Sequence, residues 1–262
     1  MALSKEILEE LATIVENAEL EAKAIAQLSI KYPEIDEQDG YDIQHIVRDR
    51  KIARGHKIVG IKAGLTSRAK MIQVGVDKPS YGYLADYFAV GDGETIDITK
   101  LIHPRVEPEI AFVLNKDLEG AGCHVGAVLA ATDFVMPALE IIDSRYENFK
   151  FDLPSVVADN SSSSRFVLGG RARAASDLDL KSLGIVMTHN GKPFSFGAGA
   201  AVLGHPAMAV AMVVNLLARR GEGIKAGSVI LTGGITEAVA VKAGDNVQLR
   251  AQGLGSVNVN FA

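Results

Sequence analysis

The fold is decided by one stretch, Val106-Glu107-Pro108-Glu109-Ile110-Ala111-Phe112-Val113-Leu114. At strand period Glu107 and Glu109 share a face, and that face continues as alanine and valine, which indicates partial burial. Two neighbouring carboxylates out of bulk water need a shared proton, a basic partner or a cation. Hard oxygen ligands suit Mg²⁺ or Mn²⁺. The alternative is a pair of surface glutamates on an edge strand marked by Pro108.

A third carboxylate interrupts an apolar run. Glu140 lies within Phe134-Val135-Met136-Pro137-Ala138-Leu139-Glu140-Ile141-Ile142-Asp143, a pattern typical of a strand covered on both faces. A buried carboxylate without a partner would cost several kcal/mol, so Glu140 needs a partner. A salt bridge to Arg105 or Arg145 is one alternative, and one metal ion shared by all three glutamates is the other.

Lys62 stands at the end of another predicted strand. The segment His56–Ser67 begins as a strand and finishes in a glycine turn that can start a helix at Ser67. Binding groups are often presented at such strand ends, where a lysine can neutralise charge or donate a proton. A simply solvated lysine is the alternative.

Two polar segments could complete a pocket. Pro79-Ser80-Tyr81-Gly82 predicts a turn that folds over it. Ala158-Asp159-Asn160-Ser161-Ser162-Ser163-Ser164-Arg165 predicts a polar loop whose hydroxyls, including that of Ser161, can hold a carboxylate. A flexible serine-rich linker explains the second segment equally well.

Composition narrows the class of protein. The chain has 262 residues with 27 basic and 32 acidic side chains, and no basic stripe, so nucleic acid is not an expected partner. We expect no apolar stretch of roughly 18 uncharged residues and therefore no membrane span. We also expect no signal peptide, and a cytoplasmic location follows. The single cysteine, Cys123, excludes an internal disulfide and a thiolate-rich metal site.

The remaining pattern predicts an α+β fold. Residues 4–31 predict one or two amphipathic helices, and Asp36 can cap another helix that ends near Gly55. His205 lies near the start of a later helix that extends through Leu217, where we expect it to be structural. Short strands separated by glycine turns then follow to the C-terminus, which predicts a rolled or barrel-like mixed sheet. We expect a helical N-terminal region over residues 1–55 and a catalytic β-roll over residues 56–262.

Four segments together resemble the fumarylacetoacetate hydrolase superfamily. They are Gly60–Ser67, Glu107-Pro108-Glu109, Leu139–Tyr146 and the glycine-rich tail. The resemblance covers nearly the whole chain and is strongest to the branch that contains hydratases and decarboxylases of aromatic meta-cleavage pathways. It implies a mixed β-roll, an Mg²⁺ or Mn²⁺ cofactor, and Glu107, Glu109 and Glu140 as metal ligands. It also implies Lys62 as the catalytic acid or base, and substrate binding by Leu65, Thr66, Ser80 and Ser161.

The resemblance favours a decarboxylase over its sister hydratase. Ser80 stands where the hydratases carry an aspartate, and segments around Arg145 and Gly253 look more like the decarboxylase. The expected reaction is conversion of 2-oxohex-3-enedioate, a small dicarboxylate 2-oxo acid, to 2-hydroxypenta-2,4-dienoate and CO₂. Hydration of that dienoate is the first alternative. A catalytically silent partner of the sister hydratase is the second, and we expect a homo-oligomer that associates with this hydratase.

Overall fold

The computed structural model describes residues 3–67 and 78–262. The α-helices are α1 (Lys5–Leu20), α2 (Leu28–Lys31), α3 (Glu37–Ala53), α5 (Val125–Ala131), α6 (Leu153–Ala158) and α7 (Pro206–Ala218). The 3₁₀ turns are η1 (Asp86–Phe88), η2 (Ile98–Lys100), η3 (Glu147–Phe149), η4 (Asn160–Ser162), η5 (Ala175–Asp177) and η6 (Gly199–Ala201). The helix start expected at Ser67 leads into residues outside the described ranges.

The strands form a large sheet, a second sheet and a short ribbon. Those of the first half are β1 (Ile58–Gly64), β2 (Ser80–Ala85), β3 (Ala89–Val90), β4 (Thr95–Ile96), β5 (Arg105–Leu114), β6 (Leu118–Glu119) and β7 (Thr132–Ile142). Those of the second half are β8 (Ser163–Leu168), β9 (Gly184–His189), β10 (Lys192–Ala198), β11 (Gly223–Ile224), β12 (Val229–Leu231), β13 (Val239–Ala240), β14 (Asn246–Ala251) and β15 (Gly255–Phe261).

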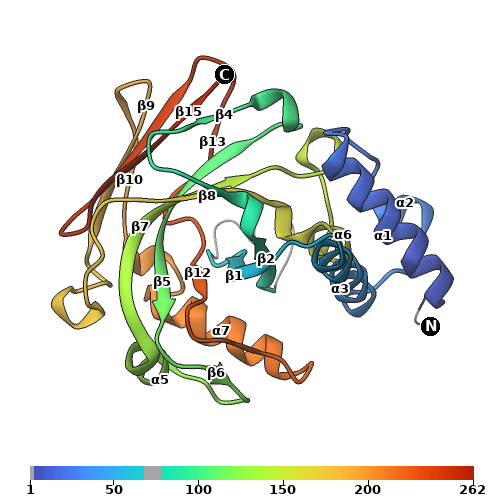
Figure 1. Cartoon of the computed structure of the whole chain (residues 1–262), viewed down its shortest axis with the longest axis horizontal. Coiled ribbons are helices and arrows are strands. Elements are labelled where there is room, and N and C mark those ends of the chain that lie inside the picture. The colour runs from blue at the N-terminus through green and yellow to red at the C-terminus, as the bar shows by residue number, and fades with distance from the viewer. Residues whose placement is uncertain (1–2, 68–77) are drawn as a thin grey trace.

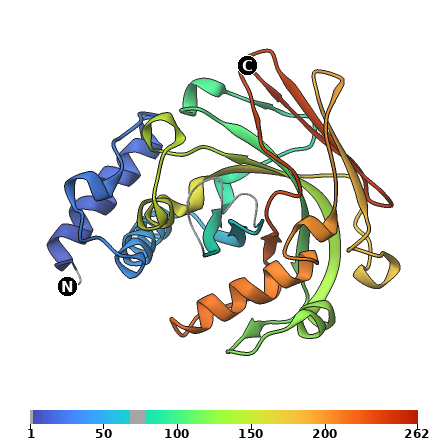
Figure 2. The same ribbon diagram turned by 180° about the vertical axis from the view of Figure 1, so that it is seen from behind.

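The large sheet is mixed and strongly curled. Its order is β2-β1-β12-β5-β7-β8-β3, with β13 paired to β5, and the second sheet runs β10-β9-β14-β15-β4. Figure 1 shows β5 and β7 as long arcs that bend around the centre. Figure 2 shows α7 on the concave side of this curled sheet. The prediction of an α+β fold with a β-roll and a helical N-terminal region is confirmed.

The core lies between the two sheets and α7. Apolar side chains from β5, β7, β9, β14, β15 and α7 form one buried cluster. On β5 this cluster contains Val106, Ile110, Phe112 and Leu114. The predicted alternation of β5 is therefore correct, and the opposite face is free to carry Glu107 and Glu109.

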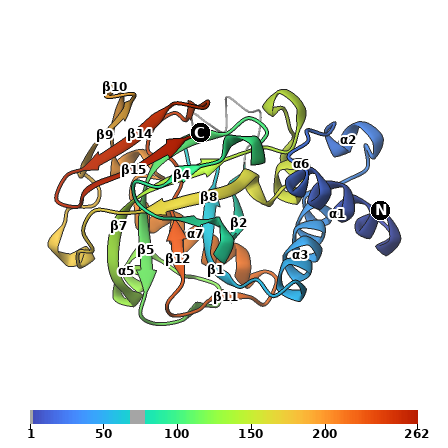
Figure 3. The ribbon, with the colours of Figure 1, turned by 45° about the horizontal axis from the view of Figure 1, so that its top comes forward.

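The N-terminal helices pack at the end of the molecule opposite the second sheet, as Figure 3 shows. The side chain of Ser4 accepts the N–H of Ile7 to cap α1, and Asp36 forms a capping box with Asp39 at α3. The apolar faces of these helices form a separate cluster that also includes Tyr146 and Ala158. The helices therefore rest on the segment that follows β7, which leads to the site.

Two local expectations are wrong for physical reasons. Residues 79–82 do not form a turn, because Ser80 begins β2 and Gly82 pairs with Lys62 of β1. Gly82 is required because a Cβ there would lie 2.3 Å from the carbonyl oxygen of Asn160. Pro108 does not mark an edge, because β5 lies between β12 and β7. Along β5, Pro108 lies in the interval between the residues that pair with β12 and those that pair with β13. No strand is paired with this side of β5 at that point, so the missing N–H of proline costs no hydrogen bond of the sheet.

The expected absence of any long apolar stretch is also wrong. Gly199–Ala218 is long and apolar enough, by length and composition, to cross a membrane. In the structure α7 begins only at Pro206, where the His205 ring accepts the N–H of Ala207. Half of the apolar window is buried inside the protein, which agrees with a core helix.

Candidate active site

Three carboxylates meet on one face of the large sheet. Glu107 of β5 lies directly opposite Glu140 of β7, and Glu109 opposes Ala138. Directly opposed residues of antiparallel strands share a face, so the three acids converge although 33 positions separate Glu107 from Glu140. One oxygen from each lies within 4.8 Å of the others, and the exposed fractions are 8%, 0% and 0% for Glu107, Glu109 and Glu140.

The electrostatics of this cluster favour a cation. Burial raises the pKa of Glu109 well above its usual value, and the charges of Glu140 and Glu107 raise it further. Burial also raises the pKa of Glu140. Among the described residues, Oε1 of Glu109 and Oε1 of Glu140 have no hydrogen-bond partner, and Oε2 of Glu140 meets only the ammonium of Lys62, at 3.2 Å. Such orphaned buried oxygens are what a hard divalent cation coordinates.

Lys62 faces the carboxylates from β1. Its Nζ lies 3.2 Å from Oε2 of Glu140 and donates a 3.0 Å hydrogen bond to the carbonyl oxygen of Ser161. Burial lowers the pKa of Lys62, but the nearby carboxylates, Glu140 foremost, raise it more, so the net shift is upward. The ammonium stays charged. Among the described residues, three carboxylates meet one ammonium here, so the cluster carries an excess of negative charge that a divalent cation would reduce.

The arginine alternative for Glu140 is wrong. The guanidinium of Arg145 pairs with Asp159 and donates to the carbonyl oxygens of Asp143 and Ser163. Arg105 lies over the ring of Phe149, with its guanidinium carbon 4.2 Å from the ring centroid. Among the described residues, the basic partner of Glu140 is therefore Lys62 and neither of these two arginines.

The serine segment is a tightly held turn and not a flexible linker. Asn160, Ser161 and Ser162 are all buried and all have positive φ, which is rare for residues with a side chain. The amide of Asn160 accepts from the N–H of Tyr83 at 2.7 Å and donates to its carbonyl oxygen at 2.9 Å. The hydroxyl of Ser161 lies 3.0 Å from that of Ser80. The turn is fixed to β2, and the carbonyl oxygen of Ser161 accepts from Lys62.

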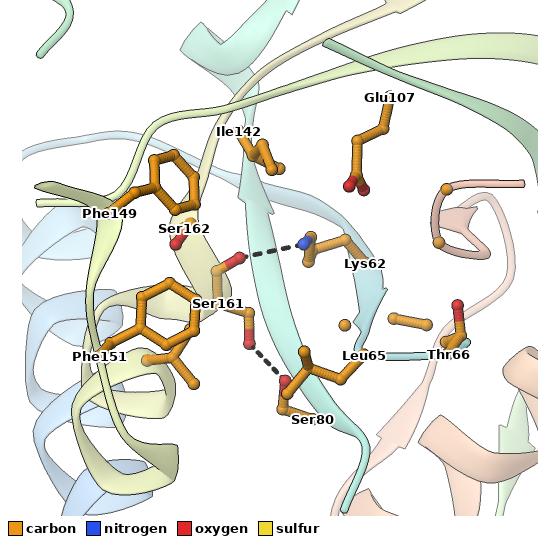
Figure 4. A pocket seen from close by; sticks show the side chains of 15 residues that line it. Lys62, Leu65, Thr66, Ser80, Glu107, Ile142, Phe149, Phe151, Ser161 and Ser162 are labelled. Atoms are coloured by element: carbon orange, nitrogen blue, oxygen red, sulfur yellow. Dashed lines mark hydrogen bonds between the residues drawn. The ribbon is translucent and has the colours of Figure 1, made fainter. Parts of the chain in front are cut away.

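Six of the predicted site residues line one small pocket of about 70 Å³. Lys62 and Glu107 lie on one side of it and Phe149 and Phe151 on the other, with Ser161 between them and Ser80 and Leu65 below (Figure 4). The predicted residues on this lining are Lys62, Leu65, Thr66, Ser80, Glu107 and Ser161. Glu109 and Glu140 are not on the lining; the carboxylate cluster holds them deeper in the fold.

The sequence interpretation missed the apolar side of this pocket. The missed lining residues include Ile142, Phe149, Phe151 and Val156. The alternation of Phe149 and Phe151 around Lys150 was the available signal, but their direction depends on a turn in which Asn148 and Phe149 both have positive φ. Gly233 and Gly234 were also missed. The N–H of Gly233 donates to Oε2 of Glu109 at 2.7 Å.

The small pocket opens into a larger hollow of about 780 Å³. The two share Leu65, Glu107, Ile142, Phe149, Phe151 and Gly234. Arg105 and Lys150 line only the larger hollow. A charged inner end and an apolar side suit a short organic acid, and the larger hollow carries the carboxylate of Glu237 as well as the two cations.

A curled mixed sheet with three converging carboxylates and a lysine defines a metal-dependent enzyme of small organic acids. The fumarylacetoacetate (FAA) hydrolase C-terminal family model matches residues 57–262, and the chain belongs to this family. The expected resemblance is confirmed.

Named relatives place the chain more narrowly. It is 59% identical over 251 residues to a 4-oxalocrotonate decarboxylase of Pseudomonas sp. (strain CF600), covering 96% of this chain and 95% of the relative. A solved 4-oxalocrotonate decarboxylase from Pseudomonas putida G7, complexed with magnesium and adipate, superimposes with a TM-score of 0.97 at 56% identity, covering 100% and 99%. A 2-keto-4-pentenoate hydratase of Paraburkholderia xenovorans (strain LB400) is 41% identical, covering 97% and 94%.

Proposed function

We propose that the chain is a magnesium-dependent carboxy-lyase that converts 2-oxohex-3-enedioate (4-oxalocrotonate) to 2-hydroxypenta-2,4-dienoate and CO₂. The observation that carries this proposal is the buried group of Glu107, Glu109 and Glu140 beside Lys62 at the inner end of the pocket. The expectation of a decarboxylase is confirmed by two decarboxylases that are 56% and 59% identical over nearly the whole chain. Hydratase relatives fit less well, at 41% identity.

Glu107, Glu109 and Glu140 would hold the Mg²⁺ ion, and the Mg²⁺-bound relative agrees with this cofactor. When bound, the cation supplies Lewis acidity that draws electron density toward the 2-oxo oxygen of the substrate. The N–H of Gly233 fixes one oxygen of Glu109, and Lys62 orients Glu140. The cluster is therefore held in place before any substrate enters.

The reaction moves one electron pair along the conjugated substrate. The bond between C5 and C6 breaks and releases CO₂, its electrons form the C4–C5 double bond, and the former C3–C4 π pair becomes C2–C3. Negative charge then develops on the C2 oxygen, and protonation there gives the product. Lys62 places a buried positive charge beside this oxygen and can supply the proton from Nζ. The hydroxyls of Ser80 and Ser161 would orient the acid, and Leu65 and Thr66 would close the pocket.

Ser80 supports decarboxylation over hydration. Addition of water to the dienoate requires a group that activates the water, and the position that carries an aspartate in the resembling hydratases has only a hydroxyl here. Among the described residues that line the small pocket, Glu107 is the one carboxylate, and it is one of the three proposed metal ligands. The pocket therefore offers its substrate no free acidic side chain from the described part of the chain.

The test is an assay of the purified chain for both products. With Mg²⁺ we expect CO₂ from 2-oxohex-3-enedioate, loss of activity in EDTA, and recovery on adding Mg²⁺. Consumption of 2-hydroxypenta-2,4-dienoate without CO₂ release would instead identify a hydratase. Neither activity, together with binding of the sister hydratase, would identify a silent partner.

Four further expectations belong to this proposal: a cytoplasmic location, a homo-oligomer, a complex with the sister hydratase, and division into a helical region (1–55) and a catalytic region (56–262). Phe194 and Phe196 support association, because both are exposed on β10, at the end of the second sheet. Sedimentation of the chain alone and with a hydratase such as the 41% identical relative would measure both assemblies.

A further inference from the structure

The site face of β5 carries an ordered series of charges. From the interior outward the series is Glu109, Glu107 and Arg105, with exposed fractions of 0% and 8% for the two acids and partial exposure for the arginine. Arg105 lies directly opposite Ile142 of β7, and Ile142 lines the small pocket (Figure 4). Because opposed residues share a face, Arg105 rises on the same side as the two glutamates.

The guanidinium of Arg105 is held in place by an aromatic ring. Its central carbon lies 4.2 Å from the ring centroid of Phe149. Phe149 is itself fixed by a turn in which Asn148 and Phe149 both have positive φ. A guanidinium stacked on a ring keeps its N–H edge available for hydrogen bonds.

No charged partner of Arg105 is found in the described part of the chain. Within residues 3–67 and 78–262 it makes no ion pair and no side-chain hydrogen bond. It faces the hollow that leads into the small pocket, and Phe149 lines both. A planar cation with a free edge at such an entrance matches a carboxylate in both charge and shape.

We propose that Arg105 binds the distal carboxylate of the substrate and thereby selects a dicarboxylate over a monocarboxylate. This inference rests on the proposed function. Two residues along a strand span about 6.6 Å, which is comparable to the reach of an extended six-carbon diacid. A substrate whose 2-oxo acid end lies at the glutamate cluster would therefore bring its other carboxylate to the level of Arg105.

The role has a kinetic consequence. The carboxylate that Arg105 binds is the one that leaves, and its negative charge moves toward the C2 oxygen in the transition state. Arg105 therefore stabilises the bound substrate more than the transition state. Removing its charge raises KM and leaves kcat unchanged or higher, whereas loss of a residue needed only for folding would lower kcat.

The test compares two ligands that differ only at the distal end. Binding of 2-oxoadipate and 2-oxohexanoate is measured by calorimetry in saturating Mg²⁺ for the wild type, Arg105→Gln and the matched control Lys150→Gln. Lys150 is an exposed cation that lines the same hollow. We expect Arg105→Gln to weaken 2-oxoadipate about tenfold or more and to leave 2-oxohexanoate unchanged, while Lys150→Gln changes neither.

Equal weakening of both ligands by Arg105→Gln, or no weakening of 2-oxoadipate, would overturn the inference. If Arg105→Gln does not fold, Arg105→Lys replaces it; it keeps the charge without the planar fork and should lose part of the preference. The binding assay needs no turnover. Absence of CO₂ release by the wild type would therefore refute the proposed function while the ligand preference still decides the role of Arg105.

Discussion

Glu109 is the residue on which the carboxylate cluster depends most. It is fully buried, one oxygen accepts from Gly233, and the other has no partner among the described residues. Without a cation its charge is repelled by Glu107 and Glu140. The same carboxylate is therefore unfavourable in the metal-free protein and favourable in the metal-bound one.

The variant Glu109→Gln should impair the metal-bound protein but leave the metal-free protein as stable as before or more stable. We expect Mg²⁺ affinity to fall by more than the ~10–100-fold that loss of an outer-shell partner costs, measured by calorimetry. In EDTA the Tm should be unchanged or higher, because one of three crowded carboxylates is gone. Glu237→Gln, which changes an exposed carboxylate of the outer hollow, is the control and should change neither value. Unaltered Mg²⁺ affinity in Glu109→Gln would contradict the proposed ligand set.

Gly233 positions Glu109 and has little room for any other residue. Its φ is +94°, and a Cβ there would lie 2.0 Å from Oγ1 of Thr66. Gly227 has a similar φ of +83°, but no described atom lies within 4 Å of the place that a Cβ would take there. Alanine at Gly227 would therefore meet only the strain of a positive φ, without a steric clash.

Both glycine-to-alanine variants should lose the ~1–3 kcal/mol of a strained backbone. Gly233→Ala should lose more than Gly227→Ala, because Thr66 must also move, and it should release less CO₂ because the amide that fixes Glu109 shifts. Urea unfolding and the CO₂ assay measure the two effects. Equal stability and equal activity of the two variants would show that the contact with Thr66 is unimportant.

Among the elements, α3 is joined to the large sheet by a polar cluster. The ring of His45 lies 3.1 Å from the hydroxyl of Tyr83 on β2, and Glu222, after α7, pairs with Arg48 at 3.0 Å. Burial and the nearby charge of Arg48 lower the pKa of His45 from 6.5 to about 4. The ring is therefore neutral at pH 7, between the cations Arg48 and Arg220 and the carboxylate of Glu222.

The sign of the pH effect follows from this depressed pKa. Between pH 6.5 and about 4 the unfolded chain binds a proton at His45 and the folded chain does not, so stability is lost as the pH falls through this window. The loss approaches roughly 2–3 kcal/mol at its lower end. Urea unfolding of His45→Gln from pH 7 to pH 4 should show a correspondingly smaller decline. An identical decline in the two proteins would refute the assignment.

The strands could be predicted individually, but their pairing could not. The alternation of Val106–Leu114 gave the two faces of β5 correctly, and the capping pattern at Asp36 gave the start of α3. The register that sets Glu107 opposite Glu140 depends on contacts between distant segments, which local periodicity does not contain. Ser80 was misplaced for the same reason. Proline and glycine next to it predict a turn, whereas pairing with β1 makes the segment a strand.

The site residues also divide into those that the sequence alone reveals and those that it does not. Buried acids reveal themselves because a carboxylate within an apolar run has a high cost, and Glu140 was found by that signal. Phe149 and Phe151 carry no such signal, since apolar side chains are ordinary in a core. Their place on the pocket depends on the positive φ of Asn148 and Phe149, a backbone state that is uncommon for residues other than glycine.

In the whole molecule, the carboxylate cluster and Lys62 bring together strands that are distant in sequence. Lys62 lies on β1, Glu107 and Glu109 on β5, and Glu140 on β7, and these strands belong to one sheet. A ligand that binds only the folded protein stabilises all of it.

We therefore expect Mg²⁺ to raise the free energy of unfolding by about 2.7 kcal/mol at a concentration 100 times its Kd. Thermal unfolding in EDTA and with added Mg²⁺ measures this shift, with NaCl at matched ionic strength as the control. An equal shift with NaCl would indicate general screening and not a specific site.

The interval in β5 at Pro108 separates the segment at the pocket entrance from the carboxylate cluster. The chain that leaves β12 is attached there by the Thr232 hydroxyl to the carbonyl oxygen of Ile110 and by the Ile235 N–H to that of Pro108. Residues 236–238 lie beyond these attachments and border the entrance. Residues 236–238 can therefore differ in number and in side-chain chemistry while the glutamates of the cluster stay in place. A changed entrance can thus admit other substrates while the carboxylate cluster stays the same.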